Sequence, residues 1–491
     1  MKYPAILAGV VILFAGATAV RAEKPKITSQ DQLPRYSYPL KGKVTDVVTN
    51  EAAYDKLAAG VKADLEKLLA DYDIADRSTL QNVLGVLMSI DLQQGRYDQA
   101  LARIEKMRGL EEKPATKLTL GLLAETYIKT RKSGDFSSDE AFRAAFAKNY
   151  AEKLASLPWD VVADNIKSAK ASAEITSGAL VLGNLESQLQ TGVDKTGTVS
   201  GDVAETLVAA RTNYAYFLPL KAERVSVLSA YVAKNFKAKP DRWTARLVTL
   251  GDADKLTPVT VCVWDSGVDV SLFPQQLWTN TGEKVDGKDD DNDGYIDDVH
   301  GIAYDLKSNK VTDLLVPLDD ARKAAYPTMR NYTKGLLDLQ ANVDSVEAGD
   351  MKKHMASLKP DEVKPFIESV NFFGNFTHGT HVAGIASAGN PAARLMAVRI
   401  TFDYRMIPDV PTREQAERDA QAAREAIAYM KAHGVRVVNM SWGGSPRDIE
   451  AAFEANGAGG TPEERKKTAR EYFQLLRVAI TEGMKDASNI L

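Results

Sequence analysis

Apolar side chains recur every three or four positions through residues 51–246, which predicts a series of amphipathic helices. The Asp-Arg-Ser sequence that begins at Asp76 is typical of a helix start within this series. The apolar stripe is clearest at Leu57, Val61, Leu65 and Leu68.

A turn at residues 95–97 separates two of these helices, and the helical pattern resumes at Ala100. The spacing of Tyr97 and Ala100 resembles one tetratricopeptide-type (TPR-like) hairpin, and no clean second copy follows. An irregular helical domain is the alternative. Residues 191–202 are rich in Gly, Thr and Ser, which predicts a loop. We therefore expect a helical N-terminal domain over residues 23–250, TPR-like in part at most.

The pattern changes near residue 251. Residues 258–264 are apolar on both alternating faces, which predicts a strand buried on both sides, as in a parallel sheet. The strand runs into Asp265, at the edge where open α/β sheets bind their ligands, although an ordinary turn also explains such an Asp. Residues 306–371 are charged and helical in pattern, so we expect a helical insertion within this second domain, residues 251–491.

The first 22 residues follow neither pattern. Lys2 precedes an apolar run over residues 5–19, and residues 20–22 suit a cleavage site. These features predict a signal peptide over residues 1–22, and therefore a periplasmic or secreted protein. A membrane anchor is the alternative, but the run is shorter than the about 20 residues that span a bilayer. We expect no membrane span after signal removal.

Composition narrows the class of protein. The 491 residues are 44% hydrophobic and 26% charged, as in ordinary globular proteins. A net charge of −4 provides no basic field, so we expect no nucleic-acid partner. The single cysteine, Cys262, cannot form an internal disulfide and lies in the expected buried strand.

Two of the five histidines, His378 and His381, fall in the short segment FTHGTHVAG. We predict a loop that enters a helix here, with His378 at the amino end of that helix. The helix dipole disfavours an imidazolium at this end, which suits a general base at neutral pH. Zinc binding is the alternative, but the pair lacks an intervening Glu and an evident third ligand.

Three segments, in this order, resemble the subtilisin-like serine peptidases, or subtilases. Asp265-Ser-Gly-Val-Asp is similar to the catalytic Asp motif of the family, and His378-Gly-Thr-His-Val-Ala-Gly is similar to its catalytic His motif. Residues 435–444, VRVVNMSWGG, resemble its substrate-binding strand. The order of Asp before His is that of the subtilisin type. The resemblance implies an α/β fold with a doubly wound parallel sheet, preceded by the all-α domain.

The resemblance also implies an activity, that of a serine-type endopeptidase that hydrolyses polypeptides without a cofactor. Asp265 would orient His378, which would carry a proton from a Ser hydroxyl to the leaving amine. The backbone of Ser441, Trp442 and Gly443 would pair with an extended peptide.

The family's nucleophile motif, Gly-Thr-Ser, does not occur in this sequence. The oxyanion-hole Asn of the family would follow the strand that begins near residue 488. We therefore expect an incomplete subtilase domain that is inactive in this form, as a fragment of a larger enzyme. The alternative is a non-catalytic pseudo-protease that binds peptides or a protein partner. The helical domain would then be its interaction arm, although a pro-region or an inhibitory cap is also compatible with the sequence.

An acidic segment, DGKDDDNDGYIDD, occupies residues 286–298. Carboxylate oxygens suit Ca²⁺, and crowded carboxylates repel one another without a cation. Counted from the first Asp of the pattern, position twelve is His300 rather than the Glu of an EF-hand, so a solvated acidic turn is the alternative. We expect structural Ca²⁺ on four carboxylates with calcium-loop spacing, those of Asp289, Asp291, Asp293 and Asp297.

Overall fold

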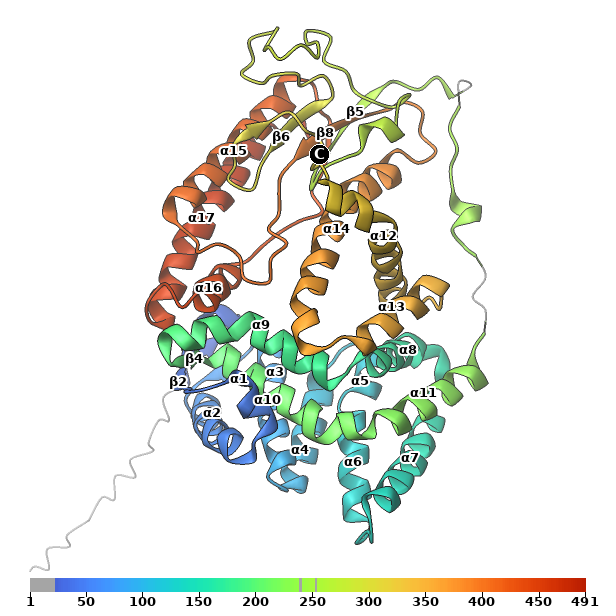
Figure 1. The fold of residues 1–491 in the computed structure, drawn as a ribbon, viewed down its shortest axis with the longest axis vertical. Coiled ribbons are helices and arrows are strands. Elements are labelled where there is room, and N and C mark those ends of the chain that lie inside the picture. Colours follow the sequence, from blue (N-terminus) through green and yellow to red (C-terminus); the bar gives the residue numbers. More distant parts are fainter. Residues whose placement is uncertain (1–22, 238–240, 252–253) are drawn as a thin grey trace, which may run out of the picture.

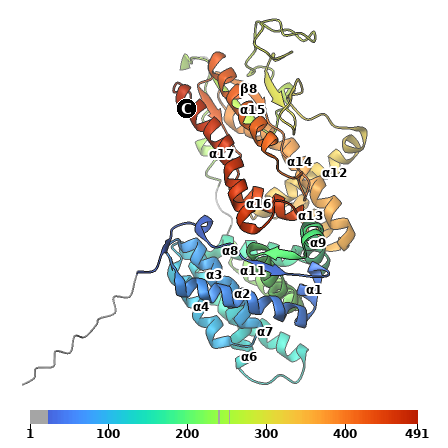
Figure 2. The same cartoon turned by 90° about the vertical axis from the view of Figure 1, so that its left-hand side faces the viewer.

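The computed structural model describes residues 23–237, 241–251 and 254–491 (Figure 1). The expected signal peptide, residues 1–22, lies outside these ranges. A helical domain forms one half of the molecule, and a domain built on a central sheet forms the other (Figures 1 and 2). Among the helices of the described ranges, none combines the length and the apolar character needed to cross a membrane.

The helical domain contains α1 to α11 and two small sheets, in which β1 pairs with β3 in parallel and β2 with β4 in antiparallel. A π-helical turn (Asn213–Phe217) and a 3-10 turn (Leu218–Leu220) connect α10 to α11. The strands are β1 (Lys26–Ile27), β2 (Ser37–Pro39), β3 (Asp73–Ile74) and β4 (Thr198–Ser200). The helices are α1 (Val44–Thr49), α2 (Glu51–Asp71), α3 (Arg77–Gln93), α4 (Tyr97–Leu110), α5 (Pro114–Thr119), α6 (Leu122–Lys132), α7 (Asp139–Ala155), α8 (Trp159–Ile175), α9 (Gly178–Thr196), α10 (Gly201–Thr212) and α11 (Lys221–Asn235).

Local signals in the sequence explain how several of these helices begin and turn. The Asp76 side chain accepts a hydrogen bond from Thr79 N–H and caps α3, as the sequence predicts. Gly95, with a φ of +69°, forms the turn between α3 and α4. The two helices pack against each other, so the chain forms the expected single hairpin at this point.

The loop expected at residues 191–202 is wrong, because α9 continues to Thr196 and is followed at once by β4 and α10. Gly192 lies within α9, and the chain does not turn there. Because glycine has no side chain, α9 can come close to the end of α16 at this point. A Cβ atom at this position would lie 2.2 Å from the carbonyl oxygen of Glu454 in the other domain.

The second domain is built on a five-stranded sheet with the order β7-β6-β8-β5-β9. The β5–β8, β5–β9 and β6–β8 pairs are parallel, whereas β7 is antiparallel to β6, so the sheet is mixed rather than wholly parallel. Asp265 and Arg399 lie in register at the carboxyl ends of β5 and β8. The strands are β5 (Val259–Asp265), β6 (Gly301–Tyr304), β7 (Lys310–Val311), β8 (Ala393–Arg399) and β9 (Val437–Asn439).

Helices cover both faces of this sheet. Cys262 and Trp264 of β5 pack towards α15 and α17, whereas Val263 packs against Ala383 of α14 on the opposite face. Burial on both sides explains the continuous apolar run of β5 and the full burial of Cys262. The helices of this domain are α12 (Asp320–Gln340), α13 (Val346–Ser357), α14 (Pro360–Ser387), α15 (Arg413–Ala432), α16 (Pro446–Ala455) and α17 (Pro462–Asp486).

The expected insertion at residues 306–371 is helical from Asp320 onward, but it does not end before the histidine segment. Instead, α14 runs without interruption from Pro360 to Ser387 and contains His378 in its second half. The predicted loop entering a helix at residues 376–384 is therefore wrong, and His378 is far from a helix amino end. The dipole argument for a neutral imidazole does not apply to it.

One helix of the helical domain, α9, contacts two separate parts of the sheet domain. Gly183 lies against the start of α14, where a Cβ atom would be 2.6 Å from Pro360 O, and Gly192 lies against the end of α16. Apolar side chains join the first contact, because Leu180 packs in the cluster that contains Val363. The helical domain thus supports both the helix that carries His378 and the helix that follows the Ser441–Gly443 segment.

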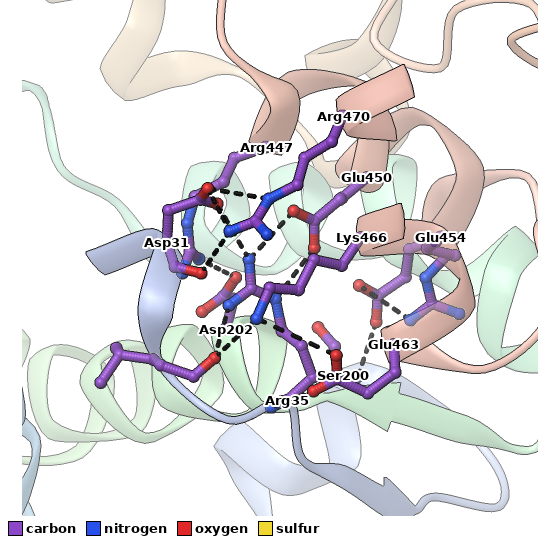
Figure 3. A network of polar contacts seen from close by, with 12 residues as sticks. Asp31, Arg35, Ser200, Asp202, Arg447, Glu450, Glu454, Glu463, Lys466 and Arg470 are labelled. Carbon is purple, nitrogen blue, oxygen red and sulfur yellow. Dashed lines mark hydrogen bonds and ion pairs between the residues drawn. The ribbon is translucent and has the colours of Figure 1, made fainter. Parts of the chain in front are cut away.

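Polar contacts reinforce the second of these interfaces (Figure 3). The guanidinium of Arg35 donates two hydrogen bonds to the Glu450 carboxylate, at 2.9 and 3.0 Å. The backbone N–H of Ser200 donates to Glu454, and Arg447 of α16 pairs with Asp202 of α10. The Arg35 and Glu450 side chains are 5% and 12% exposed, so this pair is shielded from solvent as a surface ion pair is not.

The same interface predicts a pH dependence of stability. Burial, together with the nearby Asp202 carboxylate, raises the pKa of Glu205 from 4.5 to about 7. The folded state therefore holds this proton more tightly than the unfolded state, and the stability that the proton contributes below pH 4.5 is lost as the pH rises to about 7. We expect E205Q, which stays neutral, to exceed the wild type in free energy of unfolding by on the order of 3 kcal/mol at pH 8.

Urea denaturation at pH 4.5 and pH 8 measures this difference, which we expect to vanish at pH 4.5. The exposed Glu186 of α9 provides the control, because E186Q removes a carboxylate that is in solvent in both states. An equal stabilisation by E205Q at both pH values would contradict the assignment.

Candidate active site

The first expected site residue, Asp265, is the last residue of β5 and is 1% exposed. The chain turns sharply behind it at Gly267, whose φ of +122° is a conformation that residues with a side chain rarely adopt. The turn allows the backbone N–H of Ser266 to donate to Asp265 Oδ1 at 2.7 Å. Asp265 is thus a buried carboxylate held at the carboxyl edge of the sheet, as expected.

The second expected residue, His378, approaches this carboxylate from α14. The distance from His378 Nδ1 to Asp265 Oδ1 is 2.7 Å, a hydrogen bond between residues 113 positions apart in sequence. The His378 side chain is 47% exposed, whereas that of Asp265 is 1% exposed. The imidazole therefore contacts a buried carboxylate through Nδ1, while the rest of the ring is exposed to solvent. Its second nitrogen, Nε2, is available to a reacting group.

Close packing of α14 on the turn after β5 makes this hydrogen bond possible. A Cβ atom at Gly379 would lie 2.3 Å from Gly267 O and 3.2 Å from Asp265 Cβ, so only glycine fits beside His378. Thr380 Oγ1 accepts a hydrogen bond from Asp269 N–H at 2.9 Å, which fixes the same turn to the helix from the other side. These contacts explain why the two sequence segments have their particular small and hydroxyl residues.

The expected substrate segment, Ser441, Trp442 and Gly443, follows β9 directly rather than lying within it. Trp442 Nε1 donates to the carbonyl of Trp264 at 2.7 Å, next to Asp265, and its ring packs edge-on against that of Trp264. The Ser441 hydroxyl donates to Asn439 Oδ1 at 2.8 Å. The segment is therefore anchored to the strand that ends in Asp265.

A groove of about 850 Å³ lies beside this segment, with Trp442 and Gly443 in its wall. Its walls come from the ends of β5 and β6, the loop after β8, the first half of α15, the start of α16 and the second half of α17. The apolar lining includes Trp264, Ile400, Phe402, Leu476 and Ile480. The groove lies at the carboxyl edge of the sheet, on the face that α15 and α17 cover, and neither Asp265 nor His378 is among its lining residues. A groove with such a lining can hold apolar side chains of an extended ligand.

The acidic segment does not bring its four expected ligands together. Asp289 and Asp291 converge with Glu283, whereas Asp293 converges with Asp298 and His433. Asp297 is in neither group, because its Oδ1 accepts the backbone N–H groups of residues 286 and 287. Within each group of three, the potential ligand atoms lie within 4.8 Å of one another.

Glu283, Asp298 and His433 are site residues that the sequence pattern did not reveal. Glu283 precedes the acidic repeat, and its Oε1 accepts the N–H groups of Asp290 and Asp291. Its Oε2 is buried and has no hydrogen-bond partner among the described residues. His433 ends α15 and lies 140 positions from Asp293, with 3.1 Å between Nε2 and Oδ2. Burial raises the pKa of the Asp298 carboxyl.

His381, the other half of the HxxH pair, joins neither group of potential ligands in the described part of the chain, and neither does His378. His300 uses Nδ1 to bond to the Trp278 carbonyl, at 2.8 Å. The zinc interpretation of the HxxH pair therefore lacks the further ligands that it needs.

Comparison with protein families gives one match, to the Subtilase family (Peptidase_S8), over residues 257–479. Neither a comparison with curated proteins nor one with solved structures found a match. The Asp–His pair and the five-stranded sheet lie within the matched residues, and so does the lining of the groove except Ile480 and Thr481. The match supports a subtilisin-like peptidase domain over residues 257–479.

The packing of α14 predicts a way to disrupt the pair without changing either member. In G379A, the new methyl group meets Gly267 O, so helix and turn must separate and the bond from His378 Nδ1 to Asp265 must lengthen. We expect the hydrogen-bonded Nδ1 proton of His378 to be visible far downfield in the proton NMR spectrum of the wild type and lost in G379A. Overpacking of this kind also costs about 1–3 kcal/mol in stability.

G374A is the matched control on the same helix, because a Cβ atom there has no neighbour within 4 Å. It is expected to keep the downfield proton and to be more stable than the wild type by up to about 1 kcal/mol, because Ala favours a helix interior over Gly. Loss of the signal in both variants would indicate general damage to α14, and its survival in G379A would contradict the close contact.

Proposed function

We propose that this chain carries the substrate-binding and acid–base half of an exported subtilisin-like serine endopeptidase. The observation that carries the proposal is the 2.7 Å bond between His378 Nδ1 and the buried Asp265, within residues that match the subtilase family. In this proposal, Asp265 holds the imidazole with Nε2 towards the substrate and stabilises the imidazolium when His378 takes the proton of a Ser hydroxyl. His378 then gives that proton to the leaving amine of the peptide.

The polypeptide substrate would lie along the Ser441–Gly443 segment. An extended peptide beside the end of β9 adds main-chain hydrogen bonds, and alternate side chains enter the neighbouring groove. The apolar lining of the groove, with Phe402, Leu476 and Ile480, favours peptides that carry large apolar side chains. Export is supported by the pattern of residues 1–22, which suits a periplasmic or secreted peptidase.

We also propose that the nucleophile and the oxyanion-hole Asn are not among these 491 residues. The sequence has no Gly-Thr-Ser, and Ser441, the serine of the substrate segment, uses its hydroxyl to bond to Asn439. Without the nucleophile, the Asp–His pair has no acyl group to transfer. The 491-residue form would be inactive by itself, and a separate Ser-bearing segment would restore the reaction.

A fluorophosphonate probe tests the missing nucleophile. We expect no covalent labelling of the purified 491-residue chain, as measured by intact-mass spectrometry, and no labelling of H378A. Labelling of the wild type that is lost in H378A would show that a serine within the chain is activated, and it would overturn this part of the proposal.

Peptide binding tests what the two candidate functions share, because the groove exists whether or not the chain is catalytic. Titration of the chain with an apolar peptide, followed by tryptophan fluorescence and compared with W442F, reports binding in both cases. The coding DNA beyond the Leu491 codon then decides, because an in-frame or frameshifted Gly-Thr-Ser supports the enzyme. A binder without catalysis is favoured if that DNA has no such sequence.

A structural Ca²⁺ site in the acidic segment is a separate proposal, now centred on Glu283, Asp289 and Asp291. Three carboxylates with ligand atoms within 4.8 Å suit a hard cation, and the buried, unpartnered Glu283 Oε2 is a ligand atom that points to one. We expect 1 mM Ca²⁺ to raise the melting temperature of the wild type by several degrees.

The response to Ca²⁺ should disappear in D289N/D291N, because two of the three ligands are lost. D350N, which changes an exposed Asp of α13, is the control and should respond as the wild type does. A calcium response that survives D289N/D291N would place the ion elsewhere, with the group of Asp293, Asp298 and His433 as the next one to test.

A further inference from the structure

A second cavity, of about 450 Å³, lies between the helical domain and α16, away from the Asp–His pair. Its walls come from α2, α9 and α10 on one side and from α16 and the start of α17 on the other. Leucines of the helical domain, including Leu65, Leu68 and Leu189, form an apolar wall. The polar network of Figure 3 borders the same space, with Arg35, Asp202, Arg447 and Glu450 among the lining residues.

Each arginine that lines this cavity has an acidic partner of its own. Arg35 bonds to α16, Arg447 bonds to α10, and Arg465 also bonds to the Gly460 carbonyl. The three pairs are Arg35–Glu450, Arg447–Asp202 and Arg465–Glu454. Asp448, another lining residue, caps the start of α16 through Ser445. Each guanidinium of the cavity wall is therefore paired with an acid, although Arg447 Nε is buried without a partner in the described part of the chain.

Glu205 is the carboxylate that remains. It lines the cavity from α10, and within the described part of the chain no hydrogen bond or ion pair to its carboxylate is found. The charged and titratable groups that face it are Asp202, Arg447, Tyr36 and Tyr38. Arg447 is closely paired with Asp202, so the wall next to Glu205 carries one uncompensated negative charge.

We propose that this cavity binds a small ligand in which a protonated primary amine is attached to an apolar body, with the ammonium group on Glu205. A partly buried carboxylate without a partner costs free energy, and an ammonium group reduces that cost by a charge-assisted hydrogen bond. The leucine wall accepts the apolar body of the ligand. This is the chemistry of the amino terminus of a free amino-acid derivative or of a short peptide.

The raised pKa of Glu205, which burial and then the Asp202 carboxylate produce, fits this role. An incoming ammonium group favours the charged carboxylate, so binding below about pH 7 releases a proton. The cavity also shares Pro408 and Asp448 with the groove beside Trp442. A ligand in the cavity therefore lies behind the wall of the proposed substrate groove, but the binding itself does not depend on the proposed peptidase function.

Isothermal titration calorimetry of the full chain with L-leucinamide tests the proposal. We expect saturable binding at pH 7 that is about tenfold or more weaker in E205Q and unchanged in E186Q, the exposed control on α9. N-acetyl-leucinamide, which lacks the charge, and glycinamide, which lacks the apolar body, are both expected to bind at least tenfold more weakly. Affinity should fall from pH 7 to pH 5 as Glu205 becomes protonated.

A tripeptide amide with an N-terminal leucine distinguishes the two sources of the amine. Binding equal to or tighter than that of leucinamide assigns the site to peptide termini, and weaker binding assigns it to small amines. Equal affinity of leucinamide for the wild type and E205Q would overturn the proposal, as would equal binding of N-acetyl-leucinamide. The circular dichroism spectrum of E205Q shows whether it is folded, and E205D provides a second variant that keeps the charge and should retain part of the affinity.

Discussion

The contact on which the site depends is the close approach of α14 to the turn after β5. No side chain fits between Gly379 and the carbonyl of Gly267, so the helix lies directly on the turn and brings His378 to within 2.7 Å of a fully buried carboxylate. The energetic cost of burying Asp265 is offset by the backbone N–H of Ser266 and by the imidazole, which are both bonded to Oδ1. Oδ2 is buried without a partner among the described residues, so these bonds stabilise the acid through Oδ1 alone.

The position of α14 is in turn fixed from its other end. Its first residues lie against Gly183 of α9, about 27 Å along the helix axis from His378 at the usual rise per residue. The same α9 holds the end of α16 through Gly192, and α16 follows the segment that contains Trp442. The helical domain is therefore not an independent appendage, because one of its helices sets the spacing between the two elements that carry the expected catalytic base and the expected substrate segment.

The residues of the candidate site were easier to predict from the sequence than the helices and loops around them. Asp265 and His378 occur in short contiguous segments, and each segment contains the small residues that its local packing needs. The long α14 could not be predicted, because Pro365, Gly374 and Gly379 suggest interruptions, whereas Phe372 and Phe373 are buried in a cluster that holds the helix intact. The contact between His433 and Asp293 could not be predicted for another reason. The two residues are far apart in sequence, and they meet only because α15 packs against the sheet. The N-terminal domain was predicted as helical except for a loop at residues 191–202. The composition of that segment did not show that Gly192 allows a close contact between helices.

Charge pairing distinguishes the two spaces of the molecule. In the loops around the groove, Asp409 forms ion pairs with Lys307 and Arg405. The groove itself has apolar walls, against which successive side chains of an extended peptide can pack. Around the interdomain cavity, every arginine has its own acid and Glu205 is left over. A groove whose surrounding charges are paired binds a ligand mainly through its shape and through main-chain hydrogen bonds. A cavity with an unpaired, partly buried carboxylate binds positively charged ligands in preference to neutral ones. The two spaces therefore favour different ligands, although two of the residues that separate them, Pro408 and Asp448, are common to both.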